Sequence, residues 1–435
     1  MTNRIVVFAF IITLLLPLAA WSQASSTAPD AFALKDGDRV VFFGDSITEQ
    51  RQYTKYVEQY AITRFPDRRF TFIMSGVGGD KVSGGWAGPI DQRLRRDVFA
   101  YDPTTITVML GMNDGYYRAF DEGILSTYEQ GYRHILDSFA THAPSARLTL
   151  IKPSPFDDVT RDPQFDGGYN SVMLRFSDVV ATLASEKRAN VADMNTPVVA
   201  ALTKAKAADP SLAITLMFDR VHPGGGIHWI MADALLKSWN APAIVTSVTI
   251  DADKATVSTA DNTEVAQLKK TKKDGALTWI QNDRALPLPL PSAASDPITA
   301  LALKSSTVID DLDQQVLRVT ALKPGNYELR IDDRAIDTFT AEELQKGVNL
   351  ALLETPMLAQ ARLVALDTDY RNSLEATRFS LLHSVPTSLV TQAIAKLTQA
   401  LTAAVDRQYA DAKPTAHKYS ILPAFAPATA KAAAK

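Results

Sequence analysis

The chain of 435 residues contains no cysteine, and this absence excludes several kinds of protein. Without cysteine there can be no disulfide framework, no lipoprotein anchor and no zinc site built on thiolates. An excess of one charge is also lacking. The net charge of −3 gives no reason to expect nucleic acid or an anionic membrane as a partner. The apolar content of 46% is ordinary for a globular protein, and the length allows two or three domains.

Long apolar runs are missing apart from one near the start of the chain. Arg4 precedes an apolar stretch over residues 5–18, and Ser22 and Ala24 place small residues at positions −3 and −1 of a cleavage site after Ala24. The stretch is short for a bilayer span, and a proline interrupts it. We therefore expect residues 1–24 to be a signal peptide. The mature protein should be exported, soluble in the periplasm or outside the cell, and without a stable membrane anchor.

Residues 38–240 alternate between short apolar segments, typical of buried parallel strands, and amphipathic segments, typical of helices. This alternation predicts an α/β domain over residues 30–242 with a doubly wound parallel sheet. Ligands bind beyond the carboxyl ends of the strands in such a sheet. The predicted strands are 39–44, 70–76, 104–110, 147–152 and 190–194, and the predicted helices include 53–65, 127–140 and 171–187.

The second half of the chain has a different character. Residues 243–335 contain short β-like segments separated by turn signals, which predicts a small antiparallel β module. Within it, residues 286–291 carry proline at every second position, as an extended linker does. Residues 336–412 are predicted to be a helical extension that begins with a capping box at Thr340. The end of the chain, 413–435, is predicted to be a disordered tail.

One serine and one histidine have neighbours suited to acyl-transfer chemistry. Of the six histidines, only His222 has an aspartate three residues before it, Asp219. Ser46 directly follows the first predicted strand, where its hydroxyl would be exposed. Nucleophilic catalysis needs such a serine, a histidine to take its proton and a carboxylate to orient the histidine. Taken alone, Ser46 is more simply explained as a helix N-cap, and His222 as a hydrogen-bonded loop histidine.

Two further segments could hold a negatively charged intermediate. The glycine-rich segment 76–79 follows the second predicted strand, and glycine allows a backbone N–H to approach a ligand closely. Asn113 follows the third predicted strand and has a side-chain amide that can donate. Each segment alone is explained by a turn. Four such segments in order, each in the loop region of the predicted sheet, favour a catalytic site.

Together these segments resemble the four blocks of the SGNH (GDSL-type) hydrolases. The matching residues are Gly44-Asp45-Ser46, Gly79, Gly111-Met112-Asn113-Asp114 and Asp219-Arg220-Val221-His222. The resemblance implies a flavodoxin-like α/β/α sandwich with a five-stranded parallel sheet. It also implies Ser46 as nucleophile and His222 as base, oriented by Asp219. The oxyanion hole would comprise the N–H groups of Ser46 and Gly79 and the Asn113 side chain.

The second block departs from the commoner family pattern. Ser75 stands where an asparagine is more usual, so Gly76, Gly78 and Gly79 are all candidate oxyanion donors. We favour Gly79 because it directly precedes Asp80, as in the family pattern. This chemistry requires no metal and no cofactor, and the sequence shows no cluster of metal ligands.

Several aromatic residues lie in loops that follow predicted strand ends. They are Trp86, Tyr116, Tyr117, Phe156 and Tyr169. Aromatic faces near a cleft suit sugar rings, and together with the predicted export they favour a carbohydrate O-acetylesterase. The same aromatics could instead only pack the loops. Two alternative functions are a lysophospholipase or broad carboxylesterase, and a glycan-binding protein that keeps the fold without turnover.

Overall fold

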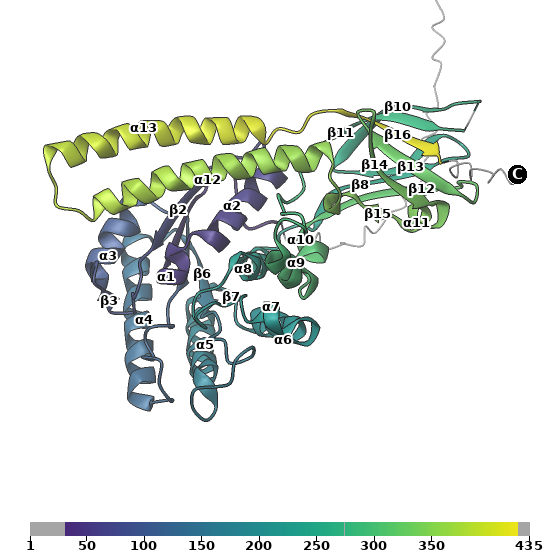
Figure 1. The fold of residues 1–435 in the computed structure, drawn as a ribbon. Coiled ribbons are helices and arrows are strands. Elements are labelled where there is room, and N and C mark those ends of the chain that lie inside the picture. The colour runs from purple at the N-terminus through teal and green to yellow at the C-terminus, as the bar shows by residue number, and fades with distance from the viewer. Residues whose placement is uncertain (1–30, 274, 425–435) are drawn as a thin grey trace, which may run out of the picture. The chain divides into compact units, whose positions relative to one another are not determined.

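The computed structural model describes residues 31–273 and 275–424, so the predicted signal peptide lies outside the described residues. From Phe32 onward the described chain forms one compact unit with two hydrophobic cores. Figure 1 shows the α/β part in purple to teal and the β-rich part in teal-green to green, with β16 in yellow. Within the described ranges, no helix combines the length and the apolar character that crossing a membrane requires.

The first core surrounds a five-stranded sheet with the order β2-β1-β5-β6-β7, in which all neighbours are parallel. This is the strand order of flavodoxin-like folds, as predicted. Each predicted strand is found within one residue of its expected bounds. The strands are β1 (Arg39–Gly44), β2 (Thr71–Gly76), β5 (Thr105–Met109), β6 (Arg147–Lys152) and β7 (Asn190–Asp193).

Helices cover both faces of this sheet. The Phe42 ring contacts Tyr53 of α2, whereas the Arg93 guanidinium of α3 lies over the Phe43 ring. Because successive side chains of a strand point to opposite faces, α2 and α3 lie on opposite sides of the sheet. The helices are α1 (Ser46–Glu49), α2 (Gln52–Arg64), α3 (Ile90–Asp97), η1 (Phe99–Tyr101), α4 (Glu122–His142), α5 (Gly168–Lys187), α6 (Thr196–Ala208), α7 (Pro210–Ala213) and α8 (Gly225–Ser238). Two short strands, β3 (Gly84–Gly85) and β4 (Gly88–Pro89), form a small hairpin before α3.

The second core is formed with two further sheets. One has the order β15-β12-β8-β9 and the other β10-β11-β16-β13-β14. The sequence predicted a purely antiparallel module, but β8 and β12 of the first sheet run parallel. The long connection between them supplies the crossover that parallel neighbours need. The strands are β8 (Ile244–Asp251), β9 (Thr256–Asp261), β10 (Thr263–Lys270), β11 (Leu277–Asp283), β12 (Gln314–Thr320), β13 (Asn326–Ile331), β14 (Arg334–Thr340) and β15 (Val348–Asn349).

The predicted linker 286–291 is not a free spacer. Its three leucines alternate with prolines, and all three are buried. Leu286 belongs to the second core, whereas Leu288 and Leu290 belong to the first. The extended segment therefore fastens the two cores together. Two short helices follow it, α9 (Pro297–Lys304) and α10 (Val308–Leu312).

The last part of the chain is helical, as predicted, but it does not end in a disordered tail. The capping box at Thr340 starts α11 (Ala341–Lys346), which is followed by η2 (Leu350–Leu352) and two long helices, α12 (Pro356–Leu382) and α13 (Ser388–Asp411). Residues 417–423 then form β16 (His417–Pro423), which lies between β11 and β13. The predicted disorder is wrong for this strand, whose Tyr419 and Ile421 side chains enter the second core. Residues 425–435 lie outside the described part.

Candidate active site

Ser46 is presented at the carboxyl end of β1. Asp45 caps α1 by accepting a hydrogen bond from the Ile47 N–H at 3.0 Å, so the chain turns into the helix at the serine. Gly44 permits this close turn, because a Cβ atom there would lie 2.2 Å from Thr48 Oγ1. The local sequence therefore places the half-buried Ser46 at the edge of the sheet where ligands bind.

The loop before α8 brings the predicted base and carboxylate to this serine. His222 Nε2 lies 2.9 Å from Ser46 Oγ, and His222 Nδ1 lies 2.6 Å from Asp219 Oδ2. Partial burial raises the pKa of Asp219, but hydrogen bonds from the side chain and backbone of His222 outweigh it and lower that pKa. The carboxylate therefore stays ionised and holds Nδ1 as a donor, which leaves Nε2 free to accept the serine proton.

The Asn113 side chain is fixed in one orientation by two hydrogen bonds. Its Nδ2 donates to the Asp80 carbonyl at 3.0 Å, and its Oδ1 accepts a hydrogen bond from the Tyr117 hydroxyl at 2.8 Å. A primary amide carries two donor hydrogens, so one remains for a ligand oxygen. Tyr116 and Tyr117 both have positive φ, 54° and 55°, which costs free energy in residues other than glycine. Such strain is typical of functional loops.

The three candidate glycines of the second block differ in their surroundings. Gly76 is a packing residue, because a Cβ atom there would lie 2.2 Å from the Glu49 nitrogen. The Gly78 carbonyl accepts a hydrogen bond from the Trp86 indole at 2.9 Å. Gly79 has a φ of 77° and open space where a Cβ would stand. In the described part of the chain its N–H donates to no protein group. These features make Gly79 suitable as a donor to a substrate oxygen.

Three buried carboxyl groups surround this region. Burial raises the pKa of Asp45 to about 7 and that of Asp114 to about 7. Burial also raises the pKa of Asp80, although Arg93 opposes the shift. These raised pKa values favour the neutral carboxyl groups. An oxyanion that forms beside them therefore meets less electrostatic repulsion from neighbouring carboxylates.

The predicted aromatic residues fall into two groups. Trp86 and Tyr116 are 74% and 57% exposed, and Tyr117 is partly exposed. Phe156 and Tyr169 are buried, which corrects their prediction as substrate contacts. The Tyr169 hydroxyl donates to the Met112 carbonyl at 2.8 Å, and the Phe156 ring packs edge-on against Tyr169. Both therefore support the loop that carries Asn113.

Sequence reasoning missed one aromatic side chain at the site. The Phe218 ring stacks on His222 with centroids 6.0 Å apart and is 62% exposed. Its position directly before Asp219 was a usable signal. The prediction also missed Arg93, whose guanidinium binds Asp80 from within α3. No local pattern pointed to that contact, because the two residues meet only in the folded chain.

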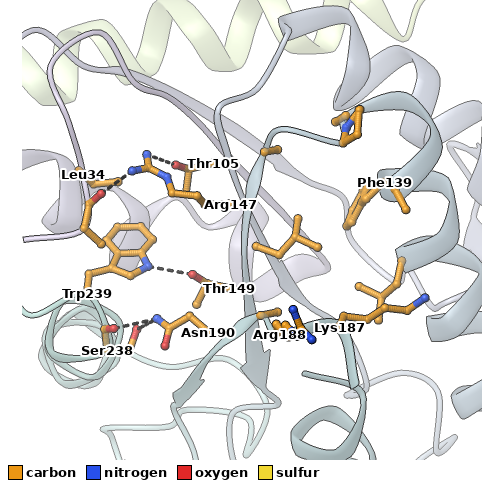
Figure 2. Close-up of a pocket in the computed structure, with 18 of the residues that line it drawn as sticks. Leu34, Thr105, Phe139, Arg147, Thr149, Lys187, Arg188, Asn190, Ser238 and Trp239 are labelled. Atoms are coloured by element: carbon orange, nitrogen blue, oxygen red, sulfur yellow. Dashed lines mark hydrogen bonds between the residues drawn. The ribbon is translucent and has the colours of Figure 1, made fainter. Parts of the chain in front are cut away.

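A cavity of about 530 Å³ lies at the opposite edge of the sheet (Figure 2). It is lined by Thr105, Arg147 and Asn190, which begin β5, β6 and β7, whereas Ser46 follows the end of β1. Some of the polar groups drawn there hydrogen-bond one another; for example, the Trp239 indole donates to Thr149. This cavity is therefore separate from the catalytic groups. Among the described residues, no cluster of three or more histidine and acidic side chains could hold a metal ion.

Comparison with known proteins decides the family. Residues 42–230 match the model of the GDSL-like lipase/acylhydrolase family. Residues 42–230 form a hydrolase domain of the SGNH (GDSL-type) family. An acetylxylan esterase of Geobacillus stearothermophilus is 24% identical over 221 residues, which cover 46% of this chain and 93% of the relative. The SGNH hydrolase described here is therefore an ester-hydrolysing enzyme.

The similarity extends beyond the catalytic part. The solved structure of a gut microbial diltiazem-metabolizing enzyme is 26% identical, covers 90% of this chain and 98% of its own, and aligns with a TM-score of 0.78. A crystal structure of the Geobacillus stearothermophilus acetylxylan esterase covers 48% of this chain and 96% of its own, with 23% identity and a TM-score of 0.39. The C-terminal extension of this SGNH hydrolase thus has a counterpart in the first of these two structures.

Proposed function

We propose that this SGNH hydrolase removes O-acetyl groups from carbohydrate through an acyl-enzyme on Ser46. The observation that carries the proposal is the unbroken hydrogen-bonded series from Ser46 through His222 to Asp219. Ser46 Oγ attacks the ester carbonyl carbon and its proton passes to His222 Nε2. The carbonyl oxygen becomes an oxyanion, held by the N–H groups of Ser46 and Gly79 and by the Asn113 amide.

The tetrahedral intermediate then collapses to an acyl-enzyme, which water hydrolyses in a second step. The bond from carbon to the sugar oxygen breaks, and His222 returns the proton to that oxygen, which releases the alcohol. A water molecule, deprotonated by the same Nε2, attacks the acetyl carbon. The carbon–Oγ bond breaks, Ser46 regains its proton and acetate leaves. Asp219 holds the ring orientation throughout and stabilises the transient imidazolium.

A cavity of about 600 Å³ is the proposed sugar site. Lys81 and Asp114, which directly follow Asp80 and Asn113 in the chain, line it together with Tyr116 and residues of α4, whereas Ser46 and His222 do not. Its size is within the range of small-molecule sites. The Lys81 ammonium lies 4.5 Å from the centroid of the Tyr116 ring and holds this exposed aromatic in place. The acetylxylan esterase relative adds support for an acetylated carbohydrate.

The whole-chain similarity favours one alternative. Because the diltiazem-metabolizing enzyme shares both the catalytic part and the extension, a broad carboxylesterase that accepts small molecules other than carbohydrates is the second candidate. The lysophospholipase prediction and the non-catalytic binding prediction have no such specific support.

The first experiment compares esters with wild-type protein and the Ser46→Ala variant. Release of acetate from acetylated xylo-oligosaccharides and from diltiazem is measured beside hydrolysis of p-nitrophenyl acetate and octanoate. We expect acetate esters to be preferred, oligosaccharides to be the better natural substrate, and Ser46→Ala to lose at least about a thousandfold in kcat. Faster reaction with diltiazem would favour the broad carboxylesterase, and preference for octanoate would reject an acetylesterase.

A variant of the proposed sugar subsite separates the two candidates further. Tyr116→Ala should raise KM for acetylated oligosaccharides about three- to tenfold, because it removes an aromatic contact worth about 1 kcal/mol. KM for p-nitrophenyl acetate should stay unchanged in the same variant. Equal changes for both substrates would show that Tyr116 does not contact the sugar.

We also infer that the enzyme is exported, on the basis of the apolar stretch that precedes the described residues. N-terminal sequencing of protein secreted by an expressing bacterium should begin at Ser25. A chain that keeps its first 24 residues and stays inside the cell would contradict this inference.

A further inference from the structure

The C-terminal helical hairpin, defined as α12, α13 and the turn between them, returns to the hydrolase domain. Figure 1 shows it running from the β-rich part along α2 towards α3. Where α12 ends, His383 Nε2 lies 3.1 Å from the Asp97 carboxylate at the end of α3. Residues nearly three hundred positions apart in the chain thus meet beside the second block of the active site.

A continuous series of contacts connects this histidine to the oxyanion donors. Asp97 binds the Arg93 guanidinium, and Arg93 Nε donates to Asp80 Oδ2 at 2.7 Å. The carbonyl of Asp80 accepts the hydrogen bond from Asn113 Nδ2. Asp80 also directly follows Gly79. Asp80 therefore contacts one candidate oxyanion donor, Asn113, and is joined by a peptide bond to another, Gly79.

All members of this series are buried and charged or polar. The side chains of Asp80, Arg93 and Asp97 have no exposed surface, and that of His383 is 8% exposed. Burial raises the pKa of Asp97, but the hydrogen bonds from His383 and Arg96 and the charge of Arg93 outweigh it, so its pKa falls to about 2. Buried charges of this kind keep their positions only while each partner stays in place.

The His383 ring is itself held on both sides. Its Nδ1 lies 2.9 Å from the Phe379 carbonyl, and its Nε2 faces Asp97, so both ring nitrogens meet oxygen acceptors. The Phe379 ring packs edge-on against the imidazole, with centroids 4.3 Å apart, and fixes its plane. Contacts within the hairpin therefore hold the His383 ring in the orientation that faces Asp97.

The hairpin also holds the strand that leads into the second block. Arg371 of α12 donates to the Phe72 carbonyl of β2 and forms a 2.5 Å ion pair with Glu58 of α2. Arg93 donates to the Ser75 carbonyl near the end of the same strand. Arg371 of the extension therefore holds the start of β2, and Arg93, whose partner Asp97 contacts His383, holds its end.

We propose that the hairpin is a positioning element of the active site, in which His383 acts through Asp97 and Arg93 to hold Asp80, and thereby Gly79 and Asn113. The oxyanion roles of Gly79 and Asn113 are those of the proposed function, on which this proposal rests. A hairpin that only braces the fold would change the unfolding temperature without changing the reactivity of Ser46 in folded protein.

The test uses full-length variants of two histidines. His383→Phe keeps the aromatic packing and removes the hydrogen bonds, whereas His383→Gln keeps a donor that can reach Asp97. His417→Phe is the matched control, because His417 Nδ1 also lies 2.6 Å from an aspartate, Asp332, and its side chain is only 11% exposed, but the pair belongs to the β-rich part. The readouts are the rate at which a fluorophosphonate labels Ser46, and kcat and KM for p-nitrophenyl acetate.

In His383→Phe we expect labelling and kcat to fall about tenfold while KM changes less than twofold. In His383→Gln they should recover to within about threefold of wild type, and His417→Phe should match wild type. Wild-type rates in folded His383→Phe would overturn the proposal, as would an equal loss in His417→Phe. If His383→Phe does not fold, His383→Asn replaces it, since its shorter amide should not reach Asp97; Asn rates equal to Gln rates would also overturn it.

The labelling experiment separates this proposal from the proposed function. Fluorophosphonate reacts with an activated serine whatever ester the enzyme prefers. Wild-type protein that is not labelled would reject the serine mechanism itself. Wild type and His383→Phe labelled at the same rate would reject only the role of the hairpin.

Discussion

At the scale of single residues, the sequence predicted which side chains meet better than it predicted what each of them does. Ser46, Asp219 and His222 lie in contact, because each stands in a short motif whose local backbone aims it at the carboxyl edge of the sheet. The aromatic residues were harder to assign. Hydrophobicity does not tell a ring that faces a ligand from one that packs beneath a loop, as the buried Tyr169 shows.

Trp86 illustrates this difference, because its indole contacts the oxyanion segment. A peptide unit is planar and trans, so its C=O and N–H point in opposite directions. By donating to the Gly78 carbonyl, the indole therefore sets the direction of the Gly79 N–H. Trp86→Phe should lower kcat about five- to tenfold, equivalent to about 1 kcal/mol, with KM for p-nitrophenyl acetate unchanged.

Steady-state kinetics of Trp86→Phe and Trp86→Ala check this prediction. If the ring served only as a platform for substrate, the phenylalanine variant would behave like wild type and the alanine variant would raise KM. That result would assign Trp86 to substrate binding instead.

The buried Asp45 should make stability depend on pH. Its pKa is 3.8 in the unfolded reference and about 7 in the fold, because burial disfavours the charged form. A folded pKa above the unfolded value stabilises the protein below pH 4, and this contribution is lost as pH rises towards 7. Asp45→Asn should therefore gain stability relative to wild type across this range, by no more than about 4 kcal/mol at pH 8.

Urea unfolding of both proteins at pH 4, 6 and 8 measures this difference. The gain should be near zero at pH 4 and reach its maximum at pH 8. A gain that does not depend on pH would show that Asp45 is not the group that titrates.

At the scale of elements, the strands of the parallel sheet were predicted within one residue, whereas α4 begins five residues before its predicted start and the edge strands β10 and β14 were not predicted. In the parallel sheet, β1, β2 and β5 are buried along almost their whole length, and β1 and β2 carry continuous apolar runs. By contrast, β10 and β14 lie at the edges of their sheet and alternate little, because solvent accepts polar residues there. β16 was missed for another reason: its partners β11 and β13 lie about 140 and 90 residues earlier in the chain, beyond any local pattern.

The interior position of β16 leads to a prediction about truncation. A chain that stops after Lys413 loses the strand between β11 and β13 and the buried Tyr419 and Ile421 side chains. Two unpaired strand edges and an open core should cause aggregation. A chain that stops after Ala424 keeps the strand and should be monodisperse, with the unfolding temperature of the full protein. Size-exclusion chromatography and circular dichroism distinguish these outcomes; a stable, unaggregated shorter chain would contradict the structural role of β16.

At the scale of the whole molecule, the domains predicted from the sequence are joined by buried contacts. Arg64 of α2 donates to the carbonyls of Pro242, Ile244 and Leu312, and so connects the hydrolase domain to the β-rich part. The predicted border at 335 cuts through β14. Changes in the residue pattern along the chain indicated where α/β segments give way to β-rich and then to helical segments. They could not reveal these contacts, because each depends on partners that come together only on folding.

The ion pair between Arg371 and Glu58 measures how strongly the extension depends on the hydrolase domain. The two side chains are 6% and 2% exposed, and Gln408 of α13 donates to the other Glu58 oxygen. Arg371→Met alone should destabilise the protein by about 3–5 kcal/mol, because it leaves the carboxyl group of Glu58 buried without its cation. Adding Glu58→Gln should recover much of this loss, since a neutral amide can be buried at lower cost. Urea unfolding of the single variants and the double variant gives the coupling free energy. Strictly additive losses would mean that the extension and the hydrolase domain are stabilised independently of this pair, whereas strong coupling makes them parts of one cooperative fold.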